Sequence, residues 1–132
     1  MPQIEIRPAR SEDREAVLAF CVSTWEWGDY IEYVWDDWLH NPDGLLLVAT
    51  LDGKPVGVAN IRMLNETDAW MEGMRVDPAN RQHGIATALF TGQIVEARRR
   101  GATNARLITE STNMAAIRLI ERSSMQRVGV FA

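Results

Sequence analysis

The stretch from Val76 to Leu89 constrains the fold of this 132-residue chain more than any other part of the sequence. An apolar-rich run, Ala69 to Val76, precedes it, and within it Ile85 and Leu89 recur at helical spacing. The loop between them contains Gly84 and leads a strand into a helix N-terminus. The first N–H groups of a helix lack intrahelical partners and lie at the positive end of the helix dipole, so they bind anions. We therefore expect a phosphate-bearing cofactor at this junction.

Around this junction the sequence predicts an ordered series of elements. They are a strand at 3–6, a helix ending near 23–28, an amphipathic helix at 25–40, strands at 45–51, 56–64 and 69–77 joined by tight turns, a helix at 84–100, a strand at 105–109, a helix at 113–122 and a last strand at 126–131. A helix separates the strands 69–77 and 105–109, so these two should lie parallel through a right-handed crossover. The predicted fold class is α/β (α+β), a single domain over residues 1–132 with a mixed antiparallel and parallel twisted sheet of about six strands flanked by about four helices.

Charge is divided unevenly between the two halves of the chain. No Lys or Arg occurs between Arg14 and Lys54, an interval with eight acidic residues, whereas basic residues outnumber acidic ones from Arg75 onward. A negative region favours a cationic acceptor such as an amine and disfavours nucleic acid, although acidic helix faces that are merely solvated fit the pattern equally well. The arginine run 98–100 fits a helix end that complements the dipole better than it fits a nucleic-acid site. The basic half suits a polyanionic cofactor.

Several classes of protein are excluded by what the sequence lacks. No apolar run reaches the roughly 20 residues that cross a bilayer, and the N-terminus has no signal-like region, so we expect a cytoplasmic protein without membrane contact. Cys21 is the only cysteine, which rules out an intrachain disulfide or a zinc site built on a thiol pair. His40 and His83 lie too far apart in sequence to suggest a metal site, so no metal is expected. The glycine fingerprints of dinucleotide-binding and P-loop proteins are also missing.

The spacing Arg81-x-x-Gly84-x-Ala86 resembles the (Arg/Gln)-x-x-Gly-x-(Gly/Ala) signature of the GNAT superfamily of acyl-CoA-dependent N-acetyltransferases. The order of elements resembles that family over nearly the whole chain. The resemblance implies acetyl-CoA (coenzyme A) as co-substrate, with its pyrophosphate on the loop amides and its pantetheine arm along the strand that ends at Val76. The cofactor-binding residues implied in this way are Met74, Arg75, Val76, Arg81, Gln82, His83, Gly84, Ile85, Ala86, Thr87 and Asn113.

A second region resembles the family motif Asn-x-x-Ala-x-x-Leu-Tyr-x-x-x-Gly-Phe. Three positions match and three differ: Asn113, Ala116 and Leu119 fit, whereas Ile120, Ser124 and Met125 replace the tyrosine, glycine and phenylalanine. The sequence ends at Ala132, which leaves little room for the family's seventh strand. A homodimer in which a partner supplies or covers the C-terminal strand is one expectation, because an exposed edge strand is normally covered. A trimmed domain and a piece of a longer chain are the alternatives.

Acetyl transfer to an amine needs a base, and Glu72 is the candidate. Family members often carry an acid or a histidine on this strand. Period-two alternation predicts that Glu72 shares a strand face with Trp70, Met74 and Val76. We expect Glu72 to remove the proton of the amine, directly or through water. The alternative is a carboxylate that faces solvent or pairs with a nearby arginine, Arg62 or Arg75.

Two further needs of the reaction are met less completely by the sequence. The backbone N–H of Met74 or Val76 is the candidate donor to the developing oxyanion. The tyrosine that commonly protonates the leaving thiolate in the family is Ile120 here. This loss supports an alternative function, a catalytically weak or inactive coenzyme A-binding domain with a regulatory or assembly role.

The acceptor site is expected between the first two helices, as the family resemblance implies. Aromatic and acidic residues gather there and could form a box for an ammonium group: Trp25, Trp27, Tyr30, Glu26 and Asp29. Packing of the second helix on the sheet explains Trp35 and Trp38 equally well. The substrate class is therefore a small-molecule or peptide amine.

Overall fold

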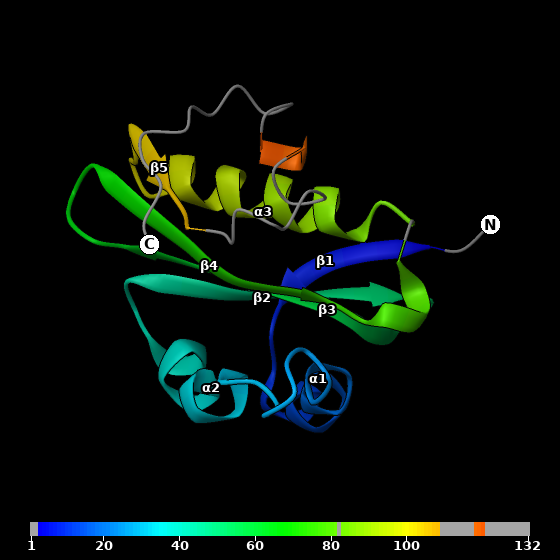
Figure 1. The fold of residues 1–132 in the computed structure, drawn as a ribbon. Helices are drawn as coiled ribbons and strands as arrows, with labels where there is room; N and C mark the ends of the chain where they lie inside the picture. The colour runs from blue at the N-terminus through cyan, green and yellow to red at the C-terminus, as the bar shows by residue number, and fades with distance from the viewer. Residues whose placement is uncertain (1–2, 82, 109–117, 121–132) are drawn as a thin grey trace.

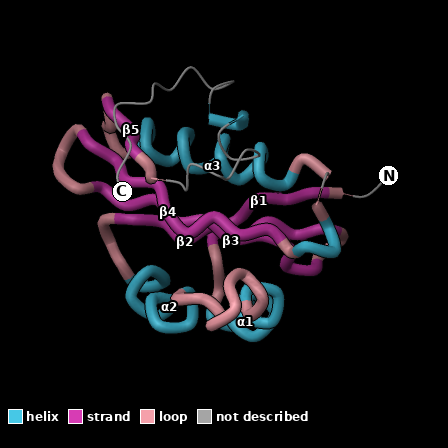
Figure 2. Tube along the Cα trace, viewed as in Figure 1, coloured by secondary structure: helices cyan, strands magenta, loops and turns pink. Residues whose placement is uncertain are grey.

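A twisted sheet forms the central layer of the molecule, with helices on both of its faces (Figure 1, Figure 2). The structure is a computed structural model in which residues 3–81, 83–108 and 118–120 are described. Helices α1 (Arg14–Cys21) and α2 (Ile31–His40) lie on one face, and α3 (Ile85–Arg99) lies on the other (Figure 1). The predicted α/β class is confirmed.

The sheet has the order β1-β2-β3-β4-β5. Its strands are β1 (Ile4–Pro8), β2 (Gly44–Leu51), β3 (Lys54–Met63), β4 (Asp68–Val76) and β5 (Asn104–Arg106). The first four strands are antiparallel to their neighbours, and β5 runs parallel to β4 after the α3 crossover, as predicted. The described residues thus form five strands where about six were expected. The sixth expected strand, 126–131, lies outside the described residues.

The helices differ from the sequence-based boundaries chiefly at the start of α2. The prediction of a helix from residue 25 is wrong, because α2 begins at Ile31. Trp25 and Gly28 instead form an isolated antiparallel bridge, and Gly28 has a φ of 107°, which closes a turn before the helix. Two short 3-10 turns, η1 (Ser11–Asp13) and η2 (Pro78–Asn80), complete the connections, and residues 118–120 are helical. Within the described ranges, no helix is both long and apolar enough to cross a membrane.

Two hydrophobic layers hold the helices to the sheet. On the α1/α2 face, Ile31 and Trp35 are at most 1% exposed and pack with Val58 of β3. On the α3 face, Ile85 and Leu89 are buried against the strands. The apolar stripe expected on α2 is thereby confirmed, since burying such a stripe supplies most of the stability of a surface helix.

A β-bulge in β4 changes which side chains share a face. Asn60 pairs with Glu72 and Val58 pairs with Arg75, so three steps on β4 match two on β3. Gly73 provides the extra residue: its φ is 69°, and a Cβ there would lie 2.5 Å from the ring of Trp38. The predicted alternation is therefore wrong beyond Glu72.

The residues of β4 on either side of the bulge now have defined faces. Glu72 and Trp70, opposite Asn60 and Arg62, lie on the α1/α2 face. Met74 and Val76 pack with the cluster of Ile85 and Leu89 on the α3 face. A period-two count could not detect this change, because one inserted residue exchanges the faces of all that follow.

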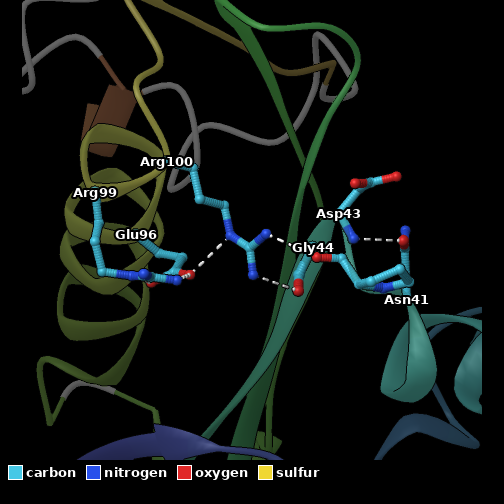
Figure 3. A network of polar contacts seen from close by, with 7 residues as sticks. Asn41, Asp43, Gly44, Glu96, Arg99 and Arg100 are labelled. Atoms are coloured by element: carbon cyan, nitrogen blue, oxygen red, sulfur yellow. Dashed lines mark hydrogen bonds and ion pairs between the residues drawn. The ribbon is translucent and has the colours of Figure 1, made fainter.

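Arg100, at the C-terminal end of α3, ties that helix to the start of β2 (Figure 3). Its Nη1 donates to the carbonyl of Pro42 at 2.9 Å, its Nη2 donates to the carbonyl of Gly44 at 2.9 Å, and its Nε donates to Glu96 at 2.8 Å. The arginine run was expected to complement the helix dipole. Arg98 and Arg99 are exposed, whereas the side chain of Arg100 is only 20% exposed. Arg100 therefore also has a structural role at this end of the molecule.

Candidate functional site

The outer edge of β4 is unpaired over most of its length in the described part of the chain. β5 pairs only with Asp68, Ala69 and Trp70. From Met71 to Val76 no described strand lies beside this edge. Its outward backbone groups are therefore open to an extended ligand, except the Met74 carbonyl, which accepts from Arg75 Nη1 at 2.9 Å. These residues include both candidate oxyanion donors.

The N-terminus of α3 follows this edge after the η2 turn, and it carries no cap from a side chain. The first intrahelical bond is donated by Ala88 to Gly84 at 3.0 Å, so the amides of residues 85–87 precede the helical ladder. The first turn of α3 contains no acidic residue that would offset the positive dipole end. These amides are suited to a phosphate group.

Gly84 gives the loop the shape that such a ligand requires. Its φ is 77°, in the left-handed region, and no described residue lies within 4 Å of the position a Cβ would take. The space beside the glycine is therefore free for a ligand to approach the backbone. Arg81 and His83 are exposed on the same loop, whereas Gln82 and Asn113, also expected to bind the cofactor, lie outside the described residues.

Glu72 is held by two donors that converge on one of its oxygens. Asn60 Nδ2 lies 3.0 Å and Arg62 Nε 2.7 Å from Glu72 Oε2. The Glu72 side chain is 16% exposed. Glu72 thus pairs with Arg62, which is part of the alternative expectation for this carboxylate. Among the described residues, no hydrogen bond or ion pair involves Glu72 Oε1, which leaves that oxygen for a substrate proton.

Arg75 fills the centre of the aromatic box that the sequence predicts for a substrate ammonium. Its guanidinium lies 5.0 Å from the ring centroid of Trp25 and 5.2 Å from that of Tyr30. It also donates to both carboxylate oxygens of Asp29, at 2.7 and 3.2 Å. The box therefore already contains a cation, supplied by β4, and an acceptor would meet its outer part.

The outer part of the box is Trp27, which stacks on Trp25 with ring centroids 5.2 Å apart. Trp27 is 66% exposed, and Glu26 beside it is exposed as well. Tyr30 continues the stack on the inner side and meets Trp38 edge-on. An aromatic face and an acidic side chain are thus presented to solvent at the end of the stack.

The Asp29–Arg75 pair is buried and remains charged. Burial raises the pKa of Asp29, but hydrogen bonds from Arg75 and Thr24 outweigh this effect and hold that pKa below its usual value. Burial lowers the pKa of Arg75, and Asp29 more than offsets this, so the net pKa is raised. Nearby, burial raises the pKa of the Cys21 thiol to about 12, which makes this cysteine an inert core residue.

The sequence shows to which family this arrangement belongs. A sequence profile described as the Acetyltransferase (GNAT) family matches residues 8–124. The chain belongs to the GNAT acetyltransferase family. The match includes both β4 and the α3 loop, so the open strand edge and the uncapped helix start described above belong to the GNAT domain proper.

Known proteins agree with this assignment. The chain is 28% identical over 114 residues to a human protein named Probable N-acetyltransferase 16, a match that covers 80% of this chain and 31% of that protein. The chain thus spans about a third of the length of this curated relative. The profile match and this relative support acetyl transfer as the general activity of the domain.

Solved structures resemble the GNAT domain in fold. A transcriptional regulator from Bacillus halodurans superposes with a TM-score of 0.85 at 22% identity, covering 98% of this chain and 97% of that one. The aminoglycoside N-acetyltransferase AAC(6')-Iy in complex with CoA gives a TM-score of 0.83 at 17% identity, with 100% and 93% covered. At these identities the likeness shows the fold alone.

Acid should destabilise the GNAT domain in a narrow pH window. The pKa values of Asp13 and Glu96 are lowered mainly by hydrogen bonds from Arg7 and Arg99, and that of Asp29 by the bonds named above. A carboxylate whose pKa in the native state lies below its unfolded value of about 4 stabilises the fold above that pH. This stabilisation is lost as the pH falls through the native pKa. We expect the free energy of unfolding to be nearly constant from about pH 7 to 5 and to drop steeply below about pH 4, measured by urea unfolding.

A matched variant separates the contribution of the buried pair. Asp29→Asn should be less stable than the parent at neutral pH, and it should lose less stability between about pH 5 and 3. A steep loss already between pH 7 and 5 would contradict this account. It would point to groups other than these three carboxylates.

Two features of the site have only a weak signal in the sequence. Asn60 is 1% exposed and stands on the same strand face as Val58, so a buried amide in an otherwise apolar row is the signal that could have identified it. The pairing of Asp29 with Arg75 joins residues 46 apart and had no local signal. Within the described part of the chain, no three His, Cys, Asp or Glu side chains come together as a metal site requires.

Proposed function

We propose that this domain transfers an acetyl group from acetyl-CoA to a primary amine by direct attack of the amine. One observation carries the proposal: the open edge of β4, from Met71 to Val76, runs toward the uncapped N-terminus of α3. An extended arm that ends in a pyrophosphate matches these two features together. The strand edge offers backbone hydrogen bonds to the arm, and the helix amides receive the negative charge.

The cofactor-binding residues are those around these two features. Met74, Arg75 and Val76 contribute backbone groups of β4, and Gly84, Ile85, Ala86 and Thr87 contribute the amides of the helix start. Arg81 and His83 are exposed beside that loop, where a cation or a ring N–H complements phosphate. Acetyl-CoA, when bound, supplies a thioester whose acyl carbon accepts the amine. Gln82 and Asn113 remain predicted members of this site.

The catalytic roles fall to groups on β4. Glu72 Oε1 accepts the proton that the amine loses, while the carboxylate is oriented through Oε2. The N–H of Met74 or Val76 donates to the acyl oxygen as negative charge develops on it. Ile120 packs with the apolar cluster of Ile61 and Phe90. Because its side chain is a hydrocarbon, it supplies no acid for the leaving thiolate. Positioning of the two reactants then provides much of the acceleration.

The acceptor is a small-molecule or peptide amine that approaches from the α1/α2 face. Trp25, Tyr30 and Asp29 hold Arg75, which shapes the inner wall of the acceptor site. Trp27 and Glu26 form its exposed part and suit a cation with an apolar body. The AAC(6')-Iy structure in complex with a bisubstrate analogue, CoA-S-monomethyl-acetylneamine, shows that this fold accommodates an aminoglycoside-type amine in that enzyme.

Two measurements test the proposal in sequence. Calorimetry with acetyl-CoA should show binding, and its absence would overturn the proposal. Release of free thiol across a panel of a polyamine, an aminoglycoside, amino acids and a peptide with a free N-terminus should identify an acceptor. Binding without turnover on any amine would instead favour a coenzyme A-binding module.

Sedimentation of the full chain tests the further proposal of a homodimer through the C-terminal strand, which lies outside the described residues.

Replacement of Gly84 tests the anion site directly. Gly84→Val should weaken coenzyme A binding on the order of tenfold or more, since the branched side chain enters the open space beside the helix amides. Because Gly84 has a positive φ, the variant should also lose about 1–2 kcal/mol of stability. Calorimetry gives the affinity and urea unfolding gives the stability.

Gly53 offers a matched control for this variant. It also has a positive φ, 87°, and nothing lies within 4 Å of its Cβ position, but it belongs to the β2–β3 turn. Gly53→Val should show a similar loss of stability and an unchanged affinity for coenzyme A. Equal affinity in both variants would show that Gly84 is not at the cofactor site.

A further inference from the structure

Two buried hydrogen-bonding residues connect α3 to the candidate base. Gln93 of α3 donates from Nε2 to the backbone carbonyl of Asn60 at 2.7 Å. Asn60 of β3 donates from Nδ2 to Glu72 Oε2 at 3.0 Å. Gln93 is 2% exposed and Asn60 is 1% exposed, so both amides are enclosed by protein. The helix that starts at the anion site is thereby connected to the carboxylate on β4.

Asn60 makes this connection at a cost to the folded state. Its Oδ1 is buried and has no hydrogen-bond partner in the described structure. A buried acceptor without a donor loses its hydration and gains nothing in return, so such groups are rare in native proteins. A leucine has nearly the same size and shape and would avoid this loss. The one bond made by the amide nitrogen is therefore the reason for an asparagine at this position.

That bond determines which oxygen of Glu72 remains available. Arg62 and Asn60 both donate to Oε2, from β3, and so they fix the carboxylate plane relative to the sheet. Of the other charged groups on this face, Arg75 and Asp29 neutralise each other, as do Arg7 and Asp13, and Arg106 of β5 lies in register with Trp70. Arg62 is 42% exposed in its side chain and is a flexible partner, whereas Asn60 is short and buried. Asn60 is thus the more rigid of the two donors.

We propose that Asn60 is a positioning residue for Glu72, which fixes the carboxylate so that Oε1 faces the acceptor amine. The inference rests on the proposed role of Glu72 as base. It goes beyond that role, because it assigns a function to a residue that contacts neither the cofactor site nor the acceptor box.

The test compares Asn60→Leu with Gln93→Met in the full chain. For Asn60→Leu we expect kcat to fall on the order of tenfold, with unchanged affinity for acetyl-CoA and an unchanged or higher Tm. The KM for the amine should change less than kcat, because the carboxylate is misplaced and not removed. For Gln93→Met we expect a lower Tm and an unchanged kcat. In a Glu72→Gln background, Asn60→Leu should cause no further loss of kcat.

Each result has a defined meaning. If Glu72→Gln lowers the rate and Asn60→Leu does not change kcat, the positioning role is wrong and the base assignment stands. If Glu72→Gln leaves the rate unchanged, the base assignment itself is wrong. If Asn60→Leu does not fold, Asn60→Ser takes its place with the same expected loss of kcat. If no amine is acetylated, the position of the Glu72 carboxylate in a crystal structure of Asn60→Leu replaces the rate: an unmoved carboxylate would overturn the inference.

Discussion

Glu72→Gln should lower kcat by about 10²- to 10⁴-fold while acetyl-CoA still binds with its normal affinity. The amide keeps the shape of the carboxylate and retains an oxygen for Asn60 and Arg62. It cannot accept the proton that the attacking amine loses. The loss should be largest near neutral pH and smaller at high pH, where more of the amine is already neutral. Initial rates of thiol release between about pH 6 and 9 measure both effects.

A second glutamate provides the control for this experiment. Glu66 is exposed in the turn between β3 and β4, and no described hydrogen bond or ion pair joins it to the site. Glu66→Gln should leave the rate and its pH dependence unchanged. A full rate for Glu72→Gln across the whole pH range, with acetyl-CoA bound, would show that another group or water alone takes the proton.

Arg75→Met should lower the free energy of unfolding by about 3–5 kcal/mol. The Asp29 side chain is 3% exposed, and without Arg75 it would be a buried charge with no cationic partner. The stack of Trp25 and Tyr30 would also lose the guanidinium that lies 5.0 and 5.2 Å from their ring centroids. Urea unfolding at neutral pH measures the loss.

Two further variants show whether burial of the charge causes the effect. Arg99→Met removes an arginine whose side chain is 65% exposed, and Glu96 keeps its ion pair with Arg100, so the loss should be far smaller than for Arg75→Met (Figure 3). The double variant Arg75→Met with Asp29→Leu should recover much of the lost stability, because apolar groups of similar size often replace a buried pair without loss. A double variant as unstable as the single one would refute the explanation by an orphaned charge.

The buried pair also bears on function. Arg75 follows the bulge in β4, between the candidate oxyanion donors Met74 and Val76, while Asp29 ends the segment that leads into α2. The pair therefore joins the segment before α2, where we propose that the acceptor binds, to β4, where we propose that the cofactor binds. We expect variants that break it to change the KM for the amine more than the affinity for acetyl-CoA.

Most of the fold was predictable because its signals are local. Alternation of apolar residues and two tight turns define the meander of β2, β3 and β4, and a helix between two strands implies a parallel pair. The Arg81-x-x-Gly84-x-Ala86 spacing identified the family, and the left-handed φ of Gly84 agrees with a glycine at that position. The start of α2 was misplaced because aromatic residues at 25–30 continue a helical pattern that tertiary contacts override.

The sequence by itself therefore determined the family and the order of elements, and it predicted an anion site at the start of α3, because each depends on residues close together in the chain. Only the tertiary structure decided three things: the bulge at Gly73 that turns Met74 and Val76 to the α3 face, the guanidinium of Arg75 inside the aromatic box, and the two donors that hold Glu72. Each depends on contacts between strands or segments far apart in sequence. Pattern and spacing carry no record of such contacts, since a strand's register and a buried ion pair are fixed only when the layers pack.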